Sequence, residues 1–192
     1  EVIRIAKQFG MEFFDGQRKH GYGGYSYDGR WQSVIRRMKK YWSLSRDVSV
    51  LDVGCGKGFM LHDFKELMPE CTVAGVDVSE YALKNAMPSV KPHLKVGSAE
   101  KLPFDDDSFD LVISINSIHN LPLEKCKKAV QEVSRVSRKH SYITVDAWRN
   151  EQQRINLMKW ILTAETYMHV DEWKKIFSEL NYHGDYWWFI AE

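Results

Sequence analysis

Apolar residues along this chain switch repeatedly between two spacings, and each spacing indicates a different element. Short apolar runs rich in β-branched or aromatic residues predict six strands, at 48–53, 72–77, 93–96, 109–115, 142–145 and 186–190. Helical periodicity predicts helices between them, over 31–44, 59–68, 80–86, 123–137, 150–165 and 171–180. Because strand and helix alternate, the pattern favours an α/β fold with a doubly wound parallel sheet and right-handed crossovers.

The segment from Asp15 to Trp31 departs from both patterns. It reads DGQRKHGYGGYSYDGRW, with five glycines, three tyrosines and no aliphatic residue. Glycine allows a close approach of the backbone, and tyrosine offers a ring with a polar tip. One interpretation is an aromatic-rich surface loop packed on the domain, and the other is a lid that forms a pocket wall. We favour the lid, because long ordered loops in compact domains usually carry a function.

The composition sets the class of protein. With 192 residues, 44% hydrophobic and 28% charged, the sequence predicts one globular domain. We expect an N-terminal lid and helix over 1–47, a cofactor-binding core over 48–146, and further helices with the last strand over 147–192. The net charge of +1 creates no field that would recruit nucleic acid or an anionic membrane.

The cysteines and the apolar runs indicate the compartment. The chain has three cysteines and no CxxC pair, which argues against a disulfide framework or a zinc site. No apolar run approaches the roughly 18 residues of a membrane span, and the first residues lack the pattern of a signal peptide. A reducing, cytoplasmic location is therefore expected.

A glycine-rich loop carries the most specific signal. Residues 50–58 read VLDVGCGKG at a predicted strand-to-helix turn, where open α/β sheets bind ligands. Its glycine spacing differs from the dinucleotide fingerprint, which would need a glycine at position 59, and no Gly-Lys-Ser/Thr of a P-loop follows. Asp52 would oppose a pyrophosphate and favour a cationic group, while Asp77, at the end of the next strand, can accept both hydroxyls of a ribose. S-adenosylmethionine combines a ribose with cationic groups and fits this description.

Three segments together resemble one family. VLDVGCGKG at 50–58, GVDVS at 75–79 and VGSAEKLPFDDDSFDLVIS at 96–114 are similar in order and spacing to class I S-adenosylmethionine-dependent methyltransferases. The nearest group is the small-molecule one, methyltransferase type 11, which includes the quinone-biosynthesis enzymes. The resemblance implies a Rossmann-like, mostly parallel sheet of six or seven strands with helices on both faces. This family normally ends in an antiparallel strand hairpin, for which the 12 residues after Leu180 scarcely suffice.

The resemblance also implies roles for individual residues in binding the cofactor S-adenosylmethionine. Asp52 would hold the ammonium, Asp77 the ribose and Asn116 would lie near the sulfonium. The backbone of the glycine loop and the border of the adenine site would add Gly54, Cys55, Gly56, Val78, Ser98, Ala99 and Glu100. Serine at position 98 departs from the family, which usually has an aspartate there.

Candidates for catalysis come from two places. His119 follows the fourth predicted strand and can act as a base near neutral pH; a substrate-contacting or structural role fits its position equally well. His20, in the glycine-tyrosine segment, is the second candidate. In the same segment Tyr22, Tyr25 and Tyr27 could close over the cofactor, and Arg30 could pair with a carboxylate. The acidic run 105–107 is best explained as a solvated turn, so we expect no metal.

After the fifth predicted strand, aromatic residues could cover the substrate cleft. For two of them, Trp160 and Trp173, packing in the core is the preferred interpretation.

These observations support methyl transfer from S-adenosylmethionine to a small molecule. The alternative is a cofactor-binding subunit of the same fold without methyl transfer activity, distinguished by whether a base such as His119 faces the sulfonium. The neutral charge argues against a nucleic-acid substrate. The sequence identifies neither the acceptor nor the oligomeric state.

Overall fold

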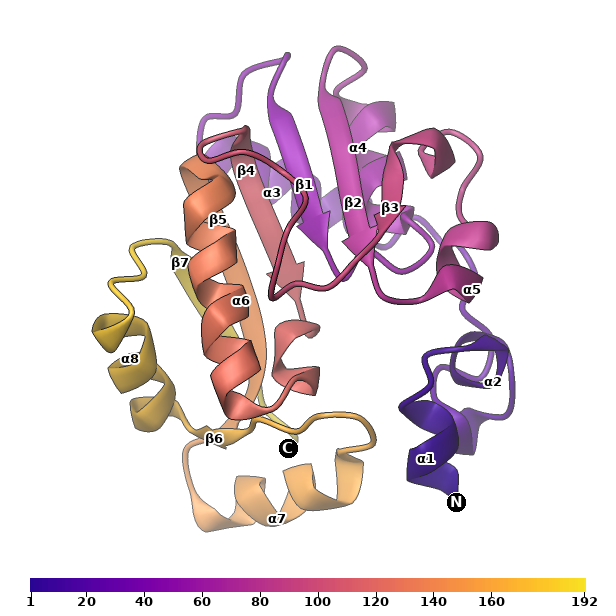
Figure 1. Ribbon diagram of the computed structural model, residues 1–192, viewed down its shortest axis with the longest axis vertical. Helices are drawn as coiled ribbons and strands as arrows, with labels where there is room; N and C mark the ends of the chain where they lie inside the picture. Colours follow the sequence, from indigo (N-terminus) through magenta and orange to yellow (C-terminus); the bar gives the residue numbers. More distant parts are fainter.

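A parallel β-sheet forms the middle layer of the molecule (Figure 1). The computed structural model describes all 192 residues. The strands follow the order β3-β2-β1-β4-β5-β6, and β7 also pairs with β5. Every pairing is parallel, which confirms the predicted Rossmann-like fold with a mostly parallel sheet. The strand bounds are β1 (Ser49–Val53), β2 (Thr72–Asp77), β3 (Leu94–Val96), β4 (Phe109–Ile115), β5 (Ser137–Trp148), β6 (Met168–His169) and β7 (Asp185–Phe189).

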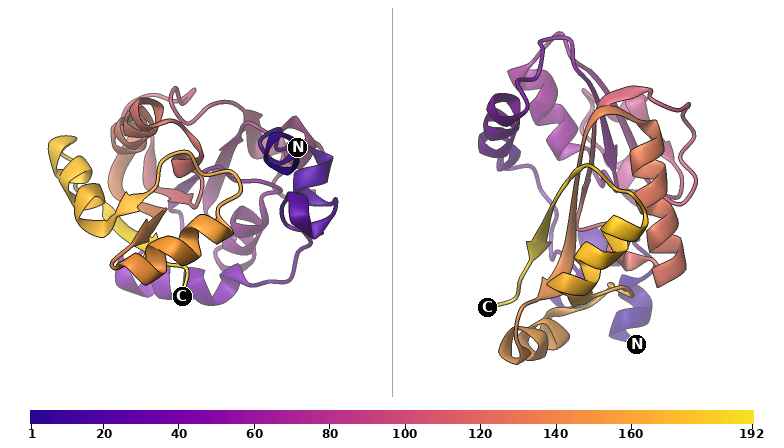
Figure 2. Two further views of the ribbon diagram at one scale, coloured as in Figure 1. Left: turned by 90° about the horizontal axis from the view of Figure 1, so that it is seen from below. Right: turned by 90° about the vertical axis from the view of Figure 1, so that its left-hand side faces the viewer.

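Helices cover both faces of the sheet, as the edge-on view of Figure 2 shows. One face carries α3 (Trp31–Tyr41), α4 (Phe59–Leu67) and α5 (Glu80–Lys84), whose apolar side chains share a buried cluster with β1 and β4. The other carries α6 (Leu123–Val136) and α8 (Val170–Glu179). The remaining helices are α1 (Val2–Ala6), α2 (Met11–Phe14) and α7 (Glu151–Trp160), with short 3₁₀ turns η1 (Arg18–His20), η2 (Lys91–His93) and η3 (Ile118–Asn120). No helix is both long enough and apolar enough to cross a membrane.

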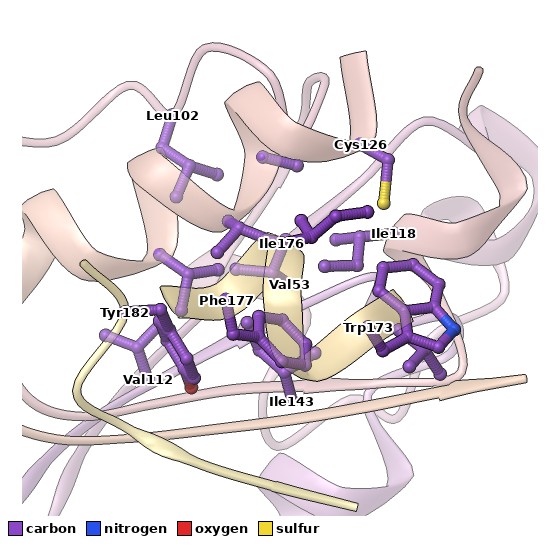
Figure 3. Close-up of a cluster of buried hydrophobic side chains, with 14 of the residues drawn as sticks. Val53, Leu102, Val112, Ile118, Cys126, Ile143, Trp173, Ile176, Phe177 and Tyr182 are labelled. Atoms are coloured by element: carbon purple, nitrogen blue, oxygen red, sulfur yellow. The ribbon is translucent and has the colours of Figure 1, made fainter. Parts of the chain in front are cut away.

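The larger buried cluster holds in place the strands whose carboxyl ends form the candidate functional site (Figure 3). Trp173 and Phe177 of α8 pack with Val112 of β4 and Ile143 of β5, and all four are almost completely buried. The Trp173 indole N–H also donates to the backbone carbonyl of Asp146, at 3.0 Å. Deep aromatic packing and this hydrogen bond hold the carboxyl end of β5 in one place.

The carboxyl-terminal part differs from the sequence prediction in two ways. β5 begins at Ser137 rather than at 142, because Arg138 and Lys139 extend it by pairing with a carboxylate on β4. The helix predicted over 150–165 ends at Trp160, since only Leu157 of α7 is buried and little apolar packing supports a longer helix. β7 runs parallel to β5 and completes a seven-stranded sheet, in agreement with the expectation that the residues after Leu180 scarcely suffice for an antiparallel hairpin.

That carboxylate belongs to Asp110, and it ties three strands together at the amino end of the sheet. It accepts hydrogen bonds from the backbone N–H and hydroxyl of Ser49 at 3.0 and 2.9 Å, and it pairs with Arg138 and Lys139 at 2.9 and 3.0 Å. Burial opposes ionisation, but these donors outweigh it and hold the pKa of Asp110 well below its ordinary value.

We therefore expect Asp110→Asn to lower the free energy of unfolding by about 1–3 kcal/mol at pH 7, the cost of losing hydrogen bonds to a charged group. Because the pKa is lower in the folded state, this stabilisation is present above the ordinary carboxyl pKa of about 3.9 and is lost as the pH falls below it. Urea unfolding at pH 7 and pH 3 measures both effects, with the exposed Asp105→Asn as the control. Equal stability of the two variants at pH 7 would contradict this role.

Candidate functional site

Three cavities meet at the carboxyl ends of the central strands. We name them after the nearest strand: the β2 cavity is lined by Asp77, the β1 cavity by Asp52, and the β5 cavity by Asp146. Tyr22 and Asn116 line all three. A ligand that filled the first two cavities would therefore be in reach of a molecule in the third.

The glycine loop between β1 and α4 is held open by its backbone conformation. Gly54 has φ of +85°, and a Cβ at this position would lie 1.9 Å from the Ser117 hydroxyl oxygen. A side chain here is excluded by both strain and space. Gly56, with φ of +53°, donates its backbone N–H to the Asp77 carboxylate at 2.7 Å.

Asp77 is fixed by the backbone on two sides. One oxygen accepts the Gly56 N–H, and the other accepts the N–H of Ser79 at 2.8 Å. Burial raises the pKa of Asp77, while these backbone hydrogen bonds counteract the rise. The carboxylate is thus held at the wall of the β2 cavity, and Val78, Ser98 and Ala99 line the same cavity.

Asp52 is a buried carboxylate without a donor of its own. It is 6% exposed and lines the β1 cavity. Burial, and then the nearby Asp77, raise the pKa of Asp52 to about 7. An isolated buried carboxylate is costly unless a cation or donor reaches it, so the β1 cavity fits a ligand with a cationic group. Cys55 and Arg30 line this cavity too, and the Arg30 guanidinium is paired with Asp28 at 2.7 Å.

Asn116 stands where the three cavities meet, directly after β4. Its φ is +49°, and its backbone N–H bonds to Thr144 of β5. The Thr144 hydroxyl donates to the side-chain oxygen of Asn116 at 2.9 Å. With its oxygen engaged, the Asn116 amide retains an NH₂ group that can donate to a ligand.

The N-terminal segment (residues 1–30) forms the remaining wall. Asp15 accepts hydrogen bonds from Lys57 of the glycine loop and from Tyr81 of α5, each at 2.7 Å. Lys57 is 7% exposed and also donates to the Tyr25 carbonyl at 2.9 Å. The Tyr22 and Tyr25 rings lie 4.4 Å apart, and Tyr25 stacks on Phe59 of α4 at 4.7 Å. This ion pair, in which Lys57 is buried and the Asp15 side chain is 30% exposed, thus fastens the tyrosines of the segment over the glycine loop.

Three predicted site residues lie outside the cavities. The His20 ring faces Glu12 at 3.1 Å, within the N-terminal segment. The Tyr27 hydroxyl donates to Asp63 of α4 at 2.6 Å, because the chain has already passed the glycine loop at that point. The Glu100 side chain is directed to Lys125 at 3.5 Å. The structure therefore does not place these three among the residues that could touch a ligand in the cavities.

The hydrogen bonding of His119 differs from what a base requires. The ring is buried on η3, and its Nδ1 accepts the backbone N–H of Asp146 at 3.3 Å. The neutral ring then carries its proton on Nε2, which lies 3.6 Å from the Asp146 carboxylate. Burial lowers the pKa of His119 to about 4. At neutral pH the ring is uncharged and its Nδ1 lone pair already accepts the Asp146 N–H, an arrangement that does not favour the predicted role as general base.

Asp146 is the functional candidate that the sequence prediction missed. It is 6% exposed in the wall of the β5 cavity, and burial raises its pKa to about 7. Its position was the available signal, since it directly follows the predicted strand 142–145 as Asp77 ends the strand 72–77. Trp160 was also misjudged: it is 57% exposed and lines the β5 cavity instead of packing in the core, whereas Trp173 is fully buried as predicted.

This chain is similar to known proteins both in sequence and in structure. Residues 50–140 match a family described as a methyltransferase domain. An uncharacterized protein of Haemophilus influenzae is 35% identical over 152 residues, covering 73% of this chain and 60% of the relative. A tRNA (carboxymethyluridine(34)-5-O)-methyltransferase of Arabidopsis thaliana is 33% identical over 154 residues, covering 79% of this chain and 36% of the relative. The chain thus spans less than two thirds of the length of either relative.

A solved structure shares the fold. YcgJ of Bacillus subtilis superimposes with a TM-score of 0.60 at 23% identity, covering 80% of this chain and 68% of YcgJ.

The Asp15–Lys57 pair yields a test of how the N-terminal segment is held. We expect Asp15→Asn to speed amide hydrogen exchange across residues 13–25 by about tenfold or more, since a hydrogen bond to a charged group contributes about 1.5–3 kcal/mol. Asp28→Asn is the matched control, because its partner Arg30 is only two residues away and the pair is exposed. Equal exchange in the two variants would show that the ion pair does not fasten the segment.

Proposed function

Residues 50–140 match a methyltransferase domain, and from this premise we propose that the chain transfers a methyl group from S-adenosylmethionine to a small-molecule acceptor. The convergence of the three cavities at Tyr22 and Asn116 is the observation that carries the proposal. Two cavities suit the two ends of the cofactor, and the third, of about 400 Å³, leaves room for an acceptor.

The β2 cavity suits the adenosine end of the cofactor. Asp77 is held so that its remaining acceptor capacity can serve the ribose hydroxyls. The exposed Val78 side chain offers an apolar face to adenine, and Ser98 and Ala99 border it. Methionine would then lie in the β1 cavity, with its ammonium at Asp52 and its carboxylate toward Arg30.

The unpartnered Asp52 supports this orientation. A buried carboxylate with a raised pKa gains most from a cation that approaches through the cavity, and the ammonium of the cofactor is such a group. The sulfonium would come near Asn116. The reaction itself is an in-line displacement at an activated carbon, in which the protein mainly orients the two partners.

Two alternative functions can be distinguished from this one by experiment. A cofactor-binding subunit would bind S-adenosylmethionine in the same cavities and transfer nothing. A tRNA substrate is suggested by the name of the Arabidopsis relative, of which this chain matches 36%. The net charge of +1 supports a small acceptor instead, because nucleic-acid binding rests on a strong excess of cations.

Removing the Asp77 carboxylate tests the ribose position. We expect Asp77→Ala to weaken S-adenosylhomocysteine binding by about 1–3 kcal/mol in calorimetry, the scale of lost hydrogen bonds to a charged group. Asp77→Asn separates the loss of charge from the loss of the Gly56 and Ser79 hydrogen bonds. Asp105→Ala, on an exposed turn, serves as the control. Unchanged affinity in both Asp77 variants would place the ribose elsewhere.

The raised pKa of Asp52 predicts a pH dependence of binding. An ammonium partner stabilises the ionised carboxylate, so the pKa of Asp52 falls on binding and a proton must be released below pH 7. Affinity for S-adenosylhomocysteine should be level above pH 7 and weaken below it, by up to about tenfold per pH unit.

Asp52→Asn should weaken S-adenosylhomocysteine binding at pH 8. It should also make the affinity depend less steeply on pH, so that any remaining pH dependence comes from Asp77. Calorimetry between pH 5.5 and 8.5 measures both effects. A wild-type affinity that does not change over this range would rule out an ammonium at Asp52.

Transfer itself is tested with a methyl-labelled cofactor and a panel of small hydroxy, amino and carboxylic compounds, with tRNA included. Labelling of a small compound is the expected result. Tight binding without any transfer would favour the cofactor-binding subunit, and labelling of tRNA alone would overturn the small-molecule acceptor.

A further inference from the structure

The β5 cavity has a charge arrangement that constrains what it can hold. Arg18 and Lys19 line it from the N-terminal segment, and Lys159 and Trp160 line it from the end of α7. Figure 1 shows these two segments at the same end of the molecule, beyond the carboxyl ends of the strands. Asp146 is the one carboxylate in the lining. Three cations thus share a cavity with a single buried acid.

Resting on the proposed function, we propose that the acceptor is an anionic small molecule with a hydroxyl group, and that Asp146 accepts the proton of that hydroxyl. The cations would hold the carboxylate or phosphate of the acceptor, and Asp146 would contact the reacting oxygen. In this assignment Asp146 is the catalytic residue and His119 is a positioning residue.

The cations are available for an anion. Arg18 donates a hydrogen bond to the Gly21 carbonyl, and its guanidinium lies over the Trp160 ring, 5.8 Å from the ring centre. No carboxylate in the structure pairs with Arg18, Lys19 or Lys159, whereas the nearby Lys7 is paired with Glu165 at 2.8 Å. The stacked, unpaired guanidinium is pre-organised for bidentate binding of a carboxylate or phosphate.

The surroundings of Asp146 select the reacting group. An acceptor carboxylate at that point would be repelled by the Asp146 carboxylate, and an ammonium would be repelled by the three cations. A neutral hydroxyl meets neither penalty and needs a proton acceptor when it reacts. The aromatic wall of Phe13, Tyr22, Trp160 and Phe189 also favours a flat apolar body between the anion and the hydroxyl.

The proton balance of the step is simple. The hydroxyl oxygen forms a bond to the methyl carbon as the bond from that carbon to sulfur breaks, and its electron pair stays on sulfur to give S-adenosylhomocysteine. The hydroxyl proton passes to Asp146. His119 positions Asp146 from the other side: its Nδ1 accepts the Asp146 backbone N–H, and its Nε2 lies 3.6 Å from the carboxylate, a contact longer than a hydrogen bond.

The first test measures which ligands the β5 cavity prefers, in protein saturated with S-adenosylhomocysteine. The probes are benzoate, phenyl phosphate and benzamide, the last being a neutral match in shape for benzoate. Calorimetry should show at least tenfold tighter binding of one of the anions than of benzamide, and the preferred anion tells carboxylate from phosphate acceptors.

Arg18→Gln and Lys159→Gln should each weaken binding of the preferred anion several-fold and leave benzamide unchanged. The control, Lys174→Gln on the exposed face of α8, should change neither. Benzamide binding as tightly as both anions, or variants without effect on the anions, would overturn the anionic acceptor. S-adenosylhomocysteine is titrated first: if it fails to bind, the proposed function fails, and if it binds without anion preference, only this inference fails.

The second test concerns Asp146 and needs no acceptor. In ¹⁵N-histidine spectra, the His119 ring signals should shift with a midpoint near pH 7 as Asp146 ionises, while the ring stays neutral. Asp146→Asn should abolish this shift. Arg18, Lys19 and Lys159 line the same cavity, but burial alone raises the pKa of Asp146, so Lys159→Gln should leave the midpoint unchanged. If the His119 signals did not shift between pH 5.5 and 8.5, or shifted equally in Asp146→Asn, the proposed ionisation of Asp146 beside His119 would be wrong.

Once the panel of compounds has identified an acceptor, turnover of that acceptor tests the role of Asp146 in the reaction. Asp146→Asn should lower kcat by about 10²–10⁴-fold, the usual contribution of a general base, and remove the rise of kcat/KM through pH 7. His119→Gln keeps a donor toward Asp146, so it should lower kcat less and leave that rise in place. Near-wild-type turnover of Asp146→Asn would remove Asp146 from the chemistry.

Discussion

The cost of burying a carboxylate governs this structure. Four aspartates lie on neighbouring strands of the parallel sheet, three of them buried and Asp77 half-buried, and their surroundings differ from one end of the sheet to the other. At the amino end, Asp110 receives a backbone N–H, a hydroxyl and two cations, and its pKa falls. At the carboxyl end, Asp52, Asp77 and Asp146 have fewer partners, and burial raises the pKa of all three. The same group, a carboxylate, thus stabilises the fold at the amino end of the sheet and remains available to bind a ligand at the carboxyl end.

The three aspartates at the carboxyl end of the sheet differ in how many hydrogen-bond donors reach their carboxylates, and this difference suggests a separate role for each. Asp77 is satisfied by two backbone N–H groups and is rigidly placed. Asp146 has one long contact with the neutral His119. Asp52 has no donor and depends most on what enters the cavity. The positive-φ glycines allow this arrangement, because a side chain at Gly54 would collide with Ser117.

Much of this architecture was readable in the sequence. Alternating periodicities predicted the parallel sheet, and the positions of Asp52 and Asp77 around the glycine loop predicted two of the three cavities. Local pattern determined these features, since strand ends and glycines are marked along the chain itself. The segment from Asp15 to Trp31 was also recognised as unusual, and its tyrosines Tyr22 and Tyr25 do line the cavities.

The remaining features depend on contacts between distant parts of the chain. The orientation of His119 is set by the backbone of Asp146, 27 residues away. The placement of Tyr27 follows from a hydrogen bond to Asp63 on α4, and that of Trp160 from the early end of α7. No periodicity or motif encodes such pairings, so the sequence could name a histidine near the site without revealing which of its nitrogen atoms carries the proton.

The account rests on the claim that the reacting centre lies where the three cavities meet. A crystal structure with S-adenosylhomocysteine bound tests this most directly. We expect the ribose hydroxyls at Asp77, the ammonium at Asp52, and the sulfur beside Asn116, facing the β5 cavity. A ligand whose sulfur lies away from Asn116, or whose ribose and amino acid ends are exchanged between the β2 and β1 cavities, would contradict it.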